Sequence, residues 1–306
     1  MTREDGAPMD VGCSAEMTNA PRLVWEVAAD LGEGPVWVER DRALWFTDIK
    51  SRKIHRFDPR TGDKDSWSAP EQVGFILPAE GGGFVAGLER GLHRFDPQDG
   101  AFELIAEVEP DLLDNRLNDG VVDPAGRIWF GTMDNRERAK NGAFYCFDRG
   151  ELKRTHLTGI AITNGPAISP DGGRLYWVDT LAGTLSVCEI GAHDELGPSR
   201  ELFHILAAEG HPDGPTVDAE GCIWISLYSG WEARRYSPDG KLLQRVRFPV
   251  SNITKLAFGG PDLRSAFATT ARHLLRPDAL DEQPLAGGLF EFDAGVTGVA
   301  SPLAAV

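Results

Sequence analysis

The sequence predicts an all-β fold, a six-bladed β-propeller built as a single domain. Six strand-like runs begin at positions 44, 84, 128, 175, 223 and 266, with the sequences LWFTD, FVAGLE, IWFGTM, LYWVDT, IWISLY and AFATTA. The steps between these positions are 40, 44, 47, 48 and 43 residues, close to the roughly 40–50 residues that one four-stranded propeller blade uses. Six periods therefore indicate six blades around a common axis.

Composition agrees with one globular domain. The chain has 306 residues, of which 42% are apolar and 25% are charged, and its 35 glycines and 20 prolines are spread along the whole length. Spread glycine and proline are typical of many tight turns between short strands. We expect residues 21–306 to form the propeller and residues 1–20 to be a disordered leader.

Charge and cysteine content limit the partners and the compartment. The formal net charge of −16 would repel nucleic-acid phosphates and anionic membranes. Residues 1–20 contain no secretory apolar run, and no stretch approaches the about 18 apolar residues that span a bilayer. The four cysteines are widely separated and lack CxxC spacing: Cys13, Cys146, Cys188 and Cys222. We therefore expect reduced thiols in a cytoplasmic protein with neither nucleic-acid nor membrane partners.

The two ends of the predicted propeller have matching patterns. Residues 22–28 (RLVWEVA) alternate large apolar residues with others, as a half-buried strand does, and residues 287–295 (GGLFEFDAG) alternate in the same way. We expect these two strands to share one blade and so to close the ring.

Repeated turn phrases separate the strands and set the repeats in register. They are HRFDPRTG at 55–62, HRFDPQDG at 93–100, VDPAGRI at 122–128, SPDGGRL at 169–175, VDAEGCI at 217–223 and YSPDGKL at 236–242. Proline fixes φ and glycine accepts positive φ, as hairpin turns require. Each blade is expected to begin with an innermost strand: EGPVW at 33–37, VGFIL at 73–77, DGVVD at 119–123, NGPAI at 164–168, DGPTV at 213–217 and TKLAF at 254–258.

The first residues of these innermost strands are expected to form a ring around the axis. They are Glu33, Val73, Asp119, Asn164, Asp213 and Thr254, at separations of 40, 46, 45, 49 and 41. Three converging carboxylates and one carboxamide lose hydration and repel one another unless a cation lies between them. All-oxygen ligands favour a hard divalent cation. We expect one such ion, with Ca²⁺ as first choice and Mg²⁺, Mn²⁺, Fe²⁺ and Zn²⁺ open.

A simpler interpretation is that these residues only cap turns. Glycine and proline follow Glu33, Asn164 and Asp213, and an acidic or amide residue often caps such a turn. Oxygen donors in the same register of four repeats favour the metal site.

At these residues the chain resembles the SMP-30/gluconolactonase/luciferin-regenerating family, which includes regucalcin and bacterial sugar-acid lactonases. The resemblance covers most of residues 22–300 and rests on LGEGPVW at 31–37, RLNDGVVDPAGRIWFGTM at 116–133, ITNGPAISPDGGRLYWVDT at 162–180 and PDGPTVDAEGCIWISLYSG at 212–230. It implies a six-bladed propeller with one divalent cation in its channel.

The resemblance also assigns roles to residues of this chain. Glu33, Asn164 and Asp213 match the family's metal ligands, and Arg116 and Asn118 match residues that hold substrate oxygens. Asp119 is placed beside the site only by the alignment of the repeats and not by a family motif, and we expect it to bind substrate as well. Family members often have acidic residues after GTM, where this chain has Asp134-Asn135-Arg136-Glu137. We therefore expect a different substrate pocket, shaped by loops 134–142 and 228–235.

These residues suit metal-assisted hydrolysis of a small sugar lactone, an aldonolactone, to the aldonic acid. The cation would polarise the carbonyl while Asp213 takes a proton from the attacking water; Asp119 or a metal-bound hydroxide are alternative bases. Two other functions stay open at this point. One is hydrolysis of organophosphate-type esters at the same site, and the other is a non-enzymatic calcium-binding scaffold.

Overall fold

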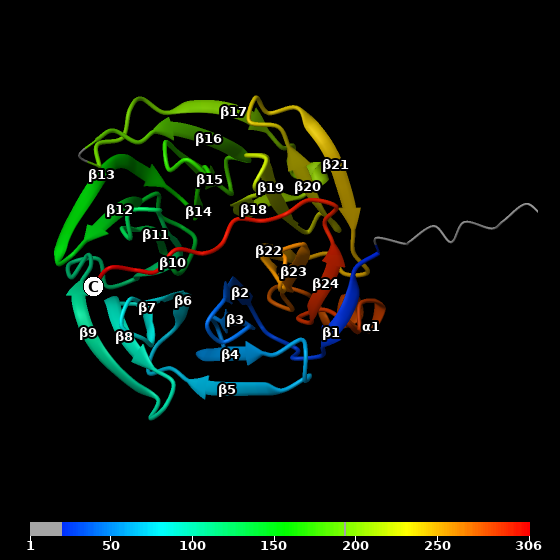
Figure 1. Ribbon diagram of the computed structural model, residues 1–306. Coiled ribbons are helices and arrows are strands. Elements are labelled where there is room, and N and C mark those ends of the chain that lie inside the picture. The colour runs from blue at the N-terminus through cyan, green and yellow to red at the C-terminus, as the bar shows by residue number, and fades with distance from the viewer. Residues whose placement is uncertain (1–19, 193) are drawn as a thin grey trace, which may run out of the picture.

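The chain folds almost entirely into short β-strands arranged in sheets around a central axis (Figure 1). The computed structural model describes residues 20–192 and 194–306, so the predicted leader, apart from residue 20, lies outside the described residues. Within them are 24 strands, one short helix, α1 (Pro277–Glu282), and one 3₁₀ turn, η1 (Ala207–Glu209). None of the described helices is long and apolar enough to cross a membrane. The all-β prediction is confirmed.

Four sheets have four strands each, and each begins with an inner strand beside the axis (Figure 1). The first contains β2 (Gly32–Val38), β3 (Ala43–Asp48), β4 (Lys53–Phe57) and β5 (Lys64–Ser68). The second contains β6 (Val73–Pro78), β7 (Phe84–Leu88), β8 (Gly91–Asp96) and β9 (Ala101–Glu107). The third contains β10 (Asn115–Val122), β11 (Ile128–Asp134), β12 (Gly142–Asp148) and β13 (Glu151–Ile160). The fourth contains β14 (Thr163–Ile168), β15 (Arg174–Asp179), β16 (Thr184–Glu189) and β17 (Arg200–His204).

The fifth sheet has eight strands. One half contains β18 (His211–Val217), β19 (Ile223–Tyr228), β20 (Glu232–Tyr236) and β21 (Leu242–Arg247). The other half contains β22 (Ile253–Gly259), β23 (Ser265–Thr270), β24 (Leu289–Asp293) and β1 (Arg22–Trp25).

The sequence predicted six separate blades, but the hydrogen bonds define four separate four-stranded sheets and one eight-stranded sheet. A single parallel pair, Gly214 with Lys255, joins inner strands β18 and β22. A Cβ on Gly214 would lie 2.6 Å from Cγ of Lys255, so only glycine lets the two strands approach this closely.

The first and last strands pair as predicted. β1 is antiparallel to β24, with Arg22 opposite Glu291 and Leu23 opposite Phe290. The N-terminal strand β1 is thus the outermost strand beside the C-terminal strand β24 in the same half of the eight-stranded sheet.

Aromatic side chains, including the tryptophans that recur in the repeats, fill the spaces between neighbouring sheets. Trp45, Trp129 and Trp224 are buried, and Trp177 is half-buried. The ring of Trp45 lies 4.4 Å from that of Phe84 in the next sheet. Each of these side chains is worth a few kcal/mol of apolar burial, which holds the sheets at a fixed angle around the axis.

Every inner strand has an irregularity close to its predicted ring position. The pairing register shifts between Glu33 and Val36, Val73 and Phe75, Leu117 and Gly120, Asn164 and Ala167, Pro212 and Pro215, and Ile253 and Lys255. Such bulges bend the strand and redirect a side chain, and they are common beside active sites. All six inner strands thus depart from regular pairing near the axis.

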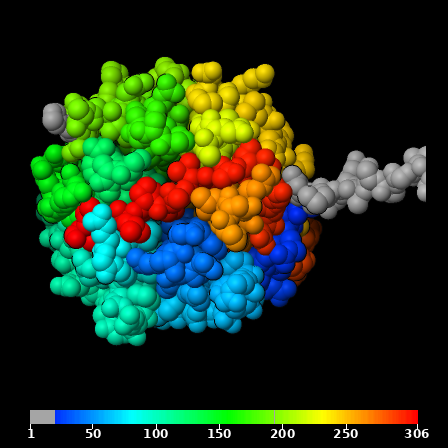
Figure 2. Space-filling model, in the orientation of Figure 1, coloured from blue at the N-terminus to red at the C-terminus, as the bar shows by residue number. Residues whose placement is uncertain are grey.

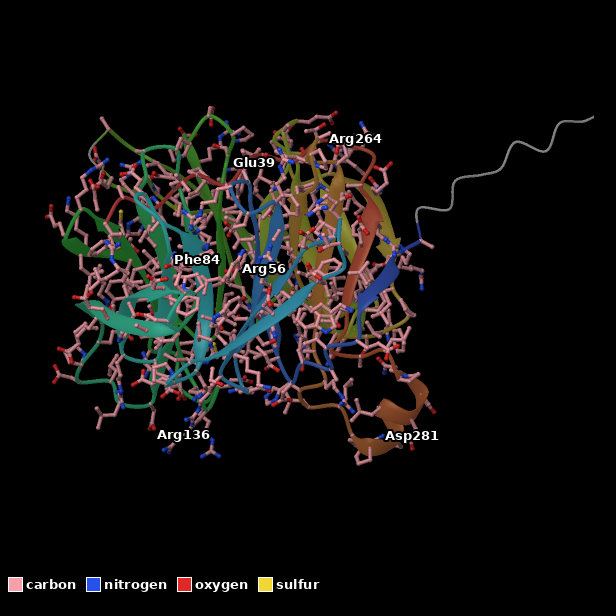
Figure 3. All side chains as sticks on the ribbon, turned by 60° about the horizontal axis from the view of Figure 1, so that its bottom comes forward. Glu39, Arg56, Phe84, Arg136, Arg264 and Asp281 are labelled. Carbon is pink, nitrogen blue, oxygen red and sulfur yellow. The ribbon has the colours of Figure 1, made fainter. Side chains whose placement is uncertain are left out.

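The C-terminal segment closes one end of the ring. After β24 it runs across the axis to the far side, as the red atoms show (Figure 2). Its backbone hydrogen bonds reach four distant turns: Ala219 N to Thr297 O, Gly298 N to Leu263 O, Ala304 N to Pro78 O and Ala305 N to Gly126 O. Figure 3 shows Glu39 and Arg264 at one end of the molecule and Arg136 and Asp281 at the other. Because the segment bonds to Leu263, it covers the end that carries Arg264.

The repeated turns depend on buried aspartates. Asp218 accepts hydrogen bonds from the backbone nitrogens of Glu220 and Cys222 (both 3.0 Å), from Trp224 Nε1 (3.0 Å) and from Arg235 Nε (2.7 Å). Asp123 does the same in the third sheet, where it binds the turn backbone, Trp129 Nε1 and Arg127 Nε. Each of these carboxylates therefore ties a hairpin turn to a tryptophan of the inter-sheet core.

Replacing Asp218 with alanine is expected to lower the free energy of unfolding by about 3–5 kcal/mol, because Arg235 and Trp224 lose a fully buried partner. Urea unfolding followed by tryptophan fluorescence measures this. Asp171→Ala is the matched control, since Asp171 occupies an equivalent turn but is exposed, and it should cost no more than about 1 kcal/mol. Equal losses in the two variants would contradict this account of the turns.

Candidate functional site

Three of the predicted ring residues face one cavity. Glu33, Asn164 and Asp213 line a cavity of about 290 Å³, together with Arg116 and Asn118. The cavity also includes Glu137, so it opens at the Arg136 end of the molecule (Figure 3). The predicted metal-ligand and substrate-binding residues, with the exception of Asp119, therefore meet in one place.

The other ring positions are used differently. Val73 is fully buried in the apolar core between the first two sheets. Thr254 donates its hydroxyl to the carbonyl of Gly32, at 2.6 Å, and lies 2.8 Å from the hydroxyl of Thr269. Neither side chain lines the cavity. Of the six predicted ring positions, only Glu33, Asn164 and Asp213 do so.

Glu33 and Asp213 are buried carboxylates with similar local bonding. One oxygen of each accepts the backbone N–H of the next residue, Gly34 (2.9 Å) or Gly214 (3.0 Å). The second oxygen of each has no hydrogen-bond partner among the described residues. Burial, followed by repulsion from Asp119, raises the pKa of Glu33 to about 8. Burial, followed by repulsion from Glu33, raises the pKa of Asp213 well above its usual range.

Two carboxamides and a guanidinium form a chain beside these carboxylates. Asn164 Nδ2 donates to the hydroxyl of Thr180 (2.8 Å), while Asn118 Nδ2 donates to the carbonyl of Thr163 (2.6 Å) and to Asn164 Oδ1 (3.2 Å). Arg116 Nη1 donates to Asn118 Oδ1 at 2.5 Å. This chain fixes the Asn164 oxygen and leaves Nη2 of Arg116 without a partner among the described residues.

Asp119 is the ring residue whose carboxylate is fully engaged. Its oxygens accept N–H groups from Gly120 (2.8 Å) and Gly165 (2.9 Å), and Lys255 Nζ lies 2.5 and 2.7 Å from them. Asp119 and Lys255 are both buried. This buried ion pair therefore occupies the channel directly behind the cavity.

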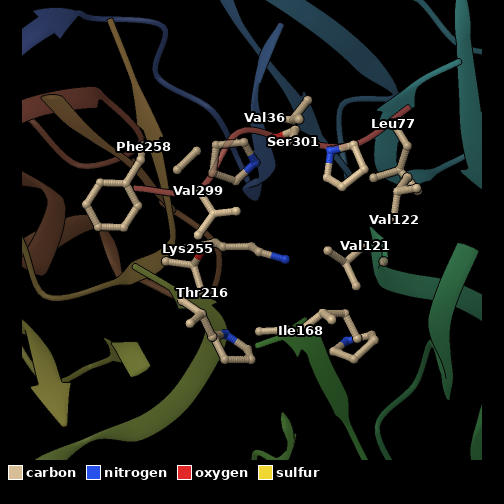
Figure 4. A pocket seen from close by; sticks show the side chains of 18 of the residues that line it. Val36, Leu77, Val121, Val122, Ile168, Thr216, Lys255, Phe258, Val299 and Ser301 are labelled. Atoms are coloured by element: carbon tan, nitrogen blue, oxygen red, sulfur yellow. The ribbon is translucent and has the colours of Figure 1, made fainter. Parts of the chain in front are cut away.

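Lys255 marks the boundary between two cavities. Its amine points into a second cavity of about 120 Å³ with walls of Val36, Leu77, Val121 and Ile168 (Figure 4). Val299 and Ser301 of the C-terminal segment also line that cavity. The first cavity thus opens away from the C-terminal segment, and the second lies beneath it.

An oxygen-donating cation site fits this chemistry, although the residues do not form a carboxylate cluster. No group of three or more His, Cys, Asp or Glu side chains is suited to hold a metal ion within residues 20–192 and 194–306. The candidate donors are instead two carboxylates and one carboxamide, Glu33, Asp213 and Asn164. The two disengaged carboxylate oxygens, with their raised pKa values, are the feature that a bound cation would relieve.

A sequence model of the SMP-30/gluconolactonase/LRE-like region matches residues 31–272. The chain belongs to this family. The match includes all six inner strands and therefore every candidate site residue.

Curated members of the family are similar to the chain over nearly its whole length. The 6-deoxy-6-sulfogluconolactonase of Pseudomonas putida is 34% identical over 275 residues, covering 89% of this chain and 94% of that protein. The L-arabinolactonase of Azospirillum brasilense is 34% identical over 283 residues, covering 91% and 93%. Regucalcin of Xenopus laevis is 32% identical over 280 residues, covering 88% and 93%.

Solved structures of the family have closely similar folds. A structure described as a calcium-binding protein, regucalcin, from Agrobacterium tumefaciens has a TM-score of 0.89 at 30% identity, covering 94% of this chain and 98% of that one. A luciferin-regenerating enzyme has a TM-score of 0.87 at 29% identity, covering 94% and 100%. The propeller architecture is therefore that of the family.

Sequence reasoning missed Lys255. Alignment of the repeats selected Thr254 as the ring residue, but the bulge between Ile253 and Lys255 turns the following side chain toward the axis. The available signal was a lysine in a strand expected to be enclosed on both faces, which requires a paired carboxylate. The predicted mouth loops do contribute to the cavity, through Glu137 from one and Tyr228 and Ser229 from the other.

The raised pKa of Glu33 predicts a pH-dependent cost of folding without a cation. Between pH 4.5 and 8 the unfolded state loses the Glu33 proton while the folded state retains it, so stability falls as pH rises, by roughly 1.4 kcal/mol per pH unit at most. Urea unfolding of metal-stripped protein at pH 5 and pH 8 measures the slope. Glu33→Gln should remove this part of it, whereas His55, whose pKa burial lowers to about 4, titrates equally in both proteins. Identical slopes would contradict the assignment.

Because Asp119 and Lys255 form a buried ion pair, we expect substitutions at the two positions to have strongly non-additive effects on the free energy of unfolding. Lys255→Met should lower the free energy of unfolding by about 3–5 kcal/mol because it leaves Asp119 buried and unpaired. The double variant Asp119→Asn with Lys255→Met should be more stable than Lys255→Met alone. A double-mutant cycle from urea unfolding measures the coupling energy, and simple additivity would contradict the pairing.

Proposed function

We propose that this protein hydrolyses a sugar lactone, an aldonolactone, to the corresponding aldonic acid with the help of one divalent cation. The observation that carries the proposal is the convergence of Glu33, Asn164 and Asp213 with Arg116 and Asn118 on one cavity. Lactonase names among the curated relatives support it. The cavity of about 290 Å³ is near the lower end of the range for small-molecule sites, which suits a single sugar ring.

Glu33, Asn164 and Asp213 are the proposed cation ligands, and Ca²⁺ is the proposed native ion. When bound, the cation supplies Lewis-acid polarisation of the lactone carbonyl and stabilises negative charge on its oxygen. All-oxygen donors suit Ca²⁺, and a solved relative is described as a calcium-binding protein. The hydrogen bonds from Gly34 and Gly214 hold each carboxylate in place, leaving its other oxygen for the cavity.

Asp213 is the proposed general base. Asp213 lines the cavity and its second oxygen accepts no hydrogen bond from the described residues, so it can take a proton from water as the water oxygen attacks the lactone carbonyl carbon. The ring C–O bond then breaks, and the departing ring oxygen receives the proton that Asp213 took from the water, which gives a hydroxyl group and returns Asp213 to its carboxylate form. Asp119 is less suited to this step, because both of its oxygens are bound by Lys255 and by two backbone N–H groups.

Arg116 and Asn118 are proposed to orient the substrate. The free Nη2 of Arg116 provides a charged donor for a hydroxyl or carbonyl oxygen. Asn118 fixes the guanidinium by accepting from Nη1 and holds Asn164 through its own amide. Asp119 is proposed to support the site from behind, since it binds the backbone N–H of Gly165 next to Asn164.

The eight-stranded sheet is proposed to count as two blades, so that the propeller has six. Its two halves each have four antiparallel strands, and only the pair Gly214 with Lys255 joins them. The proposed location is the cytoplasm, in keeping with three free, buried cysteines, Cys146, Cys188 and Cys222.

The test is hydrolysis of a panel of aldonolactones by metal-stripped protein, before and after addition of Ca²⁺, Mn²⁺, Mg²⁺, Zn²⁺ or Fe²⁺. Acid release followed with a pH indicator should depend on the added cation. Asp213→Asn should lower kcat by about 100-fold or more. The matched control Asp239→Asn, in an exposed turn, should leave kcat unchanged.

Two outcomes would contradict parts of this proposal. Full turnover by Asp213→Asn with intact cation binding would exclude Asp213 as the base. Absence of turnover with every lactone and cation would exclude the lactonase function itself, leaving the ester-hydrolase and scaffold alternatives.

A further inference from the structure

One polar side chain of the cavity, His273, takes no part in the chemistry described so far. It lines the cavity together with Tyr228 and Asn252, and its side chain is 26% exposed. The proposed cation ligands and Arg116 are buried instead. The cavity thus has a deep part, which contains the proposed cation ligands, and a part nearer to solvent, which contains His273.

His273 and Arg116 lie on opposite sides of the axis. The inner strands β2, β6, β10, β14, β18 and β22 follow one another around it, and β22 lies next to β2 (Figure 1). Arg116 belongs to β10, the third of these strands. His273 follows β23, which pairs with β22, the sixth. A molecule that occupies the cavity therefore lies between the two residues.

The backbone of His273 is held from both sides. Its N–H donates to the carbonyl of Asp30 at 2.7 Å, and its carbonyl accepts from Asn252 Nδ2 at 3.3 Å and from the hydroxyl of Tyr228. Asp30 is held in turn, because its N–H donates to Asp48 Oδ2 at 3.0 Å. A hydrogen-bonding group on a firmly held segment discriminates between substrates, because it cannot move to suit a different one.

The imidazole of His273 has one nitrogen beside a carboxylate and one nitrogen free. Nδ1 lies 3.4 Å from Oδ1 of Asp30, an arrangement that favours a proton on Nδ1. Nε2 has no hydrogen-bond partner among the described residues. It accepts a hydrogen bond when the ring is neutral and donates one when the ring is protonated, and a hydroxyl group can complete either bond.

The surroundings of His273 leave its imidazole as the polar group available to a ligand. Leu274 and Leu275 follow it in the chain and also line the cavity. The two neighbouring polar side chains, Tyr228 and Asn252, already donate to the carbonyl of His273. A hydroxyl group in this part of the cavity therefore finds a directed partner in the imidazole, between apolar walls.

We propose that His273 is a specificity-determining residue that binds the hydroxyl group on the carbon chain outside the lactone ring. With the carbonyl in the deep part of the cavity, beside the proposed cation ligands, the other end of the lactone points toward solvent and so toward His273. Asp30 is the positioning residue, because it orients the imidazole through Nδ1. The inference rests on the proposed lactonase function and adds the group by which the site distinguishes one lactone from another.

The experiment compares two lactones that differ only in this hydroxyl group. They are the pentono-1,4-lactone that the protein hydrolyses fastest and its 5-deoxy analogue, which lacks the hydroxyl group outside the ring. The wild-type protein should prefer the hydroxylated lactone about 10-fold in kcat/KM, the effect of one hydrogen bond whose protein partner is otherwise unsatisfied.

Variants at position 273 locate the source of the preference. His273→Leu should abolish it by lowering kcat/KM of the hydroxylated lactone alone, mainly through KM, because the group is remote from the reacting carbonyl. His273→Gln should keep most of it, because an amide still donates to or accepts from a hydroxyl group. His156→Leu is the matched control, since His156 is exposed on the outermost strand β13 and does not line the cavity.

Asp30→Asn tests the positioning role. It keeps the size of the side chain but removes the charge beside Nδ1, so it should lower the preference about 3-fold and leave kcat for the 5-deoxy lactone unchanged. An unchanged preference would contradict the role of Asp30.

Calorimetric titration with the two aldonate products, in the presence of Ca²⁺, gives a readout independent of turnover. The pentonate should bind about 10-fold more tightly than the 5-deoxypentonate. His273→Leu should remove that difference, and His156→Leu should preserve it.

The results separate this inference from the function on which it rests. Equal kcat/KM of the wild-type protein for the two lactones would overturn the role of His273 without any variant and leave the lactonase intact. The same conclusion follows if His273→Leu lowers kcat/KM of both lactones by the same factor. Hydrolysis of no lactone, together with equal binding of both products, would overturn both the inference and the function.

Discussion

The buried ion pair between Lys255 and Asp119 is the interaction on which the channel depends. Lys255 projects from β22 across Gly214 of β18 to reach Asp119 of β10, and Asp119 also binds the backbone of Gly165 in β14. Three inner strands, β10, β14 and β22, thus meet at one carboxylate, and β18 lies against the lysine that reaches it. Desolvation makes either charge costly alone, so the strands keep the arrangement in which both are satisfied. The position of Asn164, next to Gly165, follows from this.

The same arrangement prepares the cavity for its chemistry. Asp119 repels Glu33 and Asp213, whereas Lys255 attracts them more weakly. The fold therefore holds two buried carboxylates, Glu33 and Asp213, in an environment that penalises their charge, and only one oxygen of each accepts a hydrogen bond from the described residues. Inter-sheet packing and the buried turn aspartates supply the stability that offsets this local cost. A divalent cation would relieve this penalty, which is why the proposal places cation binding and catalysis at the same residues.

Much of the architecture could be predicted because it repeats. Turn phrases with buried aspartates such as Asp123 and Asp218 recur at nearly constant spacing, and they locate the inner strands. Glu33, Asn164 and Asp213, taken from the same register, line one cavity. Features that occur once could not be inferred in this way. The bulge that turns Lys255 inward is a local irregularity in the pairing of β22 with β23. The pairing of Gly214 with Lys255, which makes one sheet double, joins residues about 40 positions apart. An alignment of the repeats assigns the same role to corresponding positions, so it cannot predict a feature that occurs in only one repeat.

The most direct test of the account is a crystal structure of the protein soaked with Mn²⁺, with anomalous scattering used to locate the ion. The account predicts a single strong peak in the channel, coordinated by Glu33, Asn164 and Asp213 and separated from Lys255 by Asp119. A peak elsewhere with this cavity empty, or coordination through Asp119 after displacement of Lys255, would contradict it.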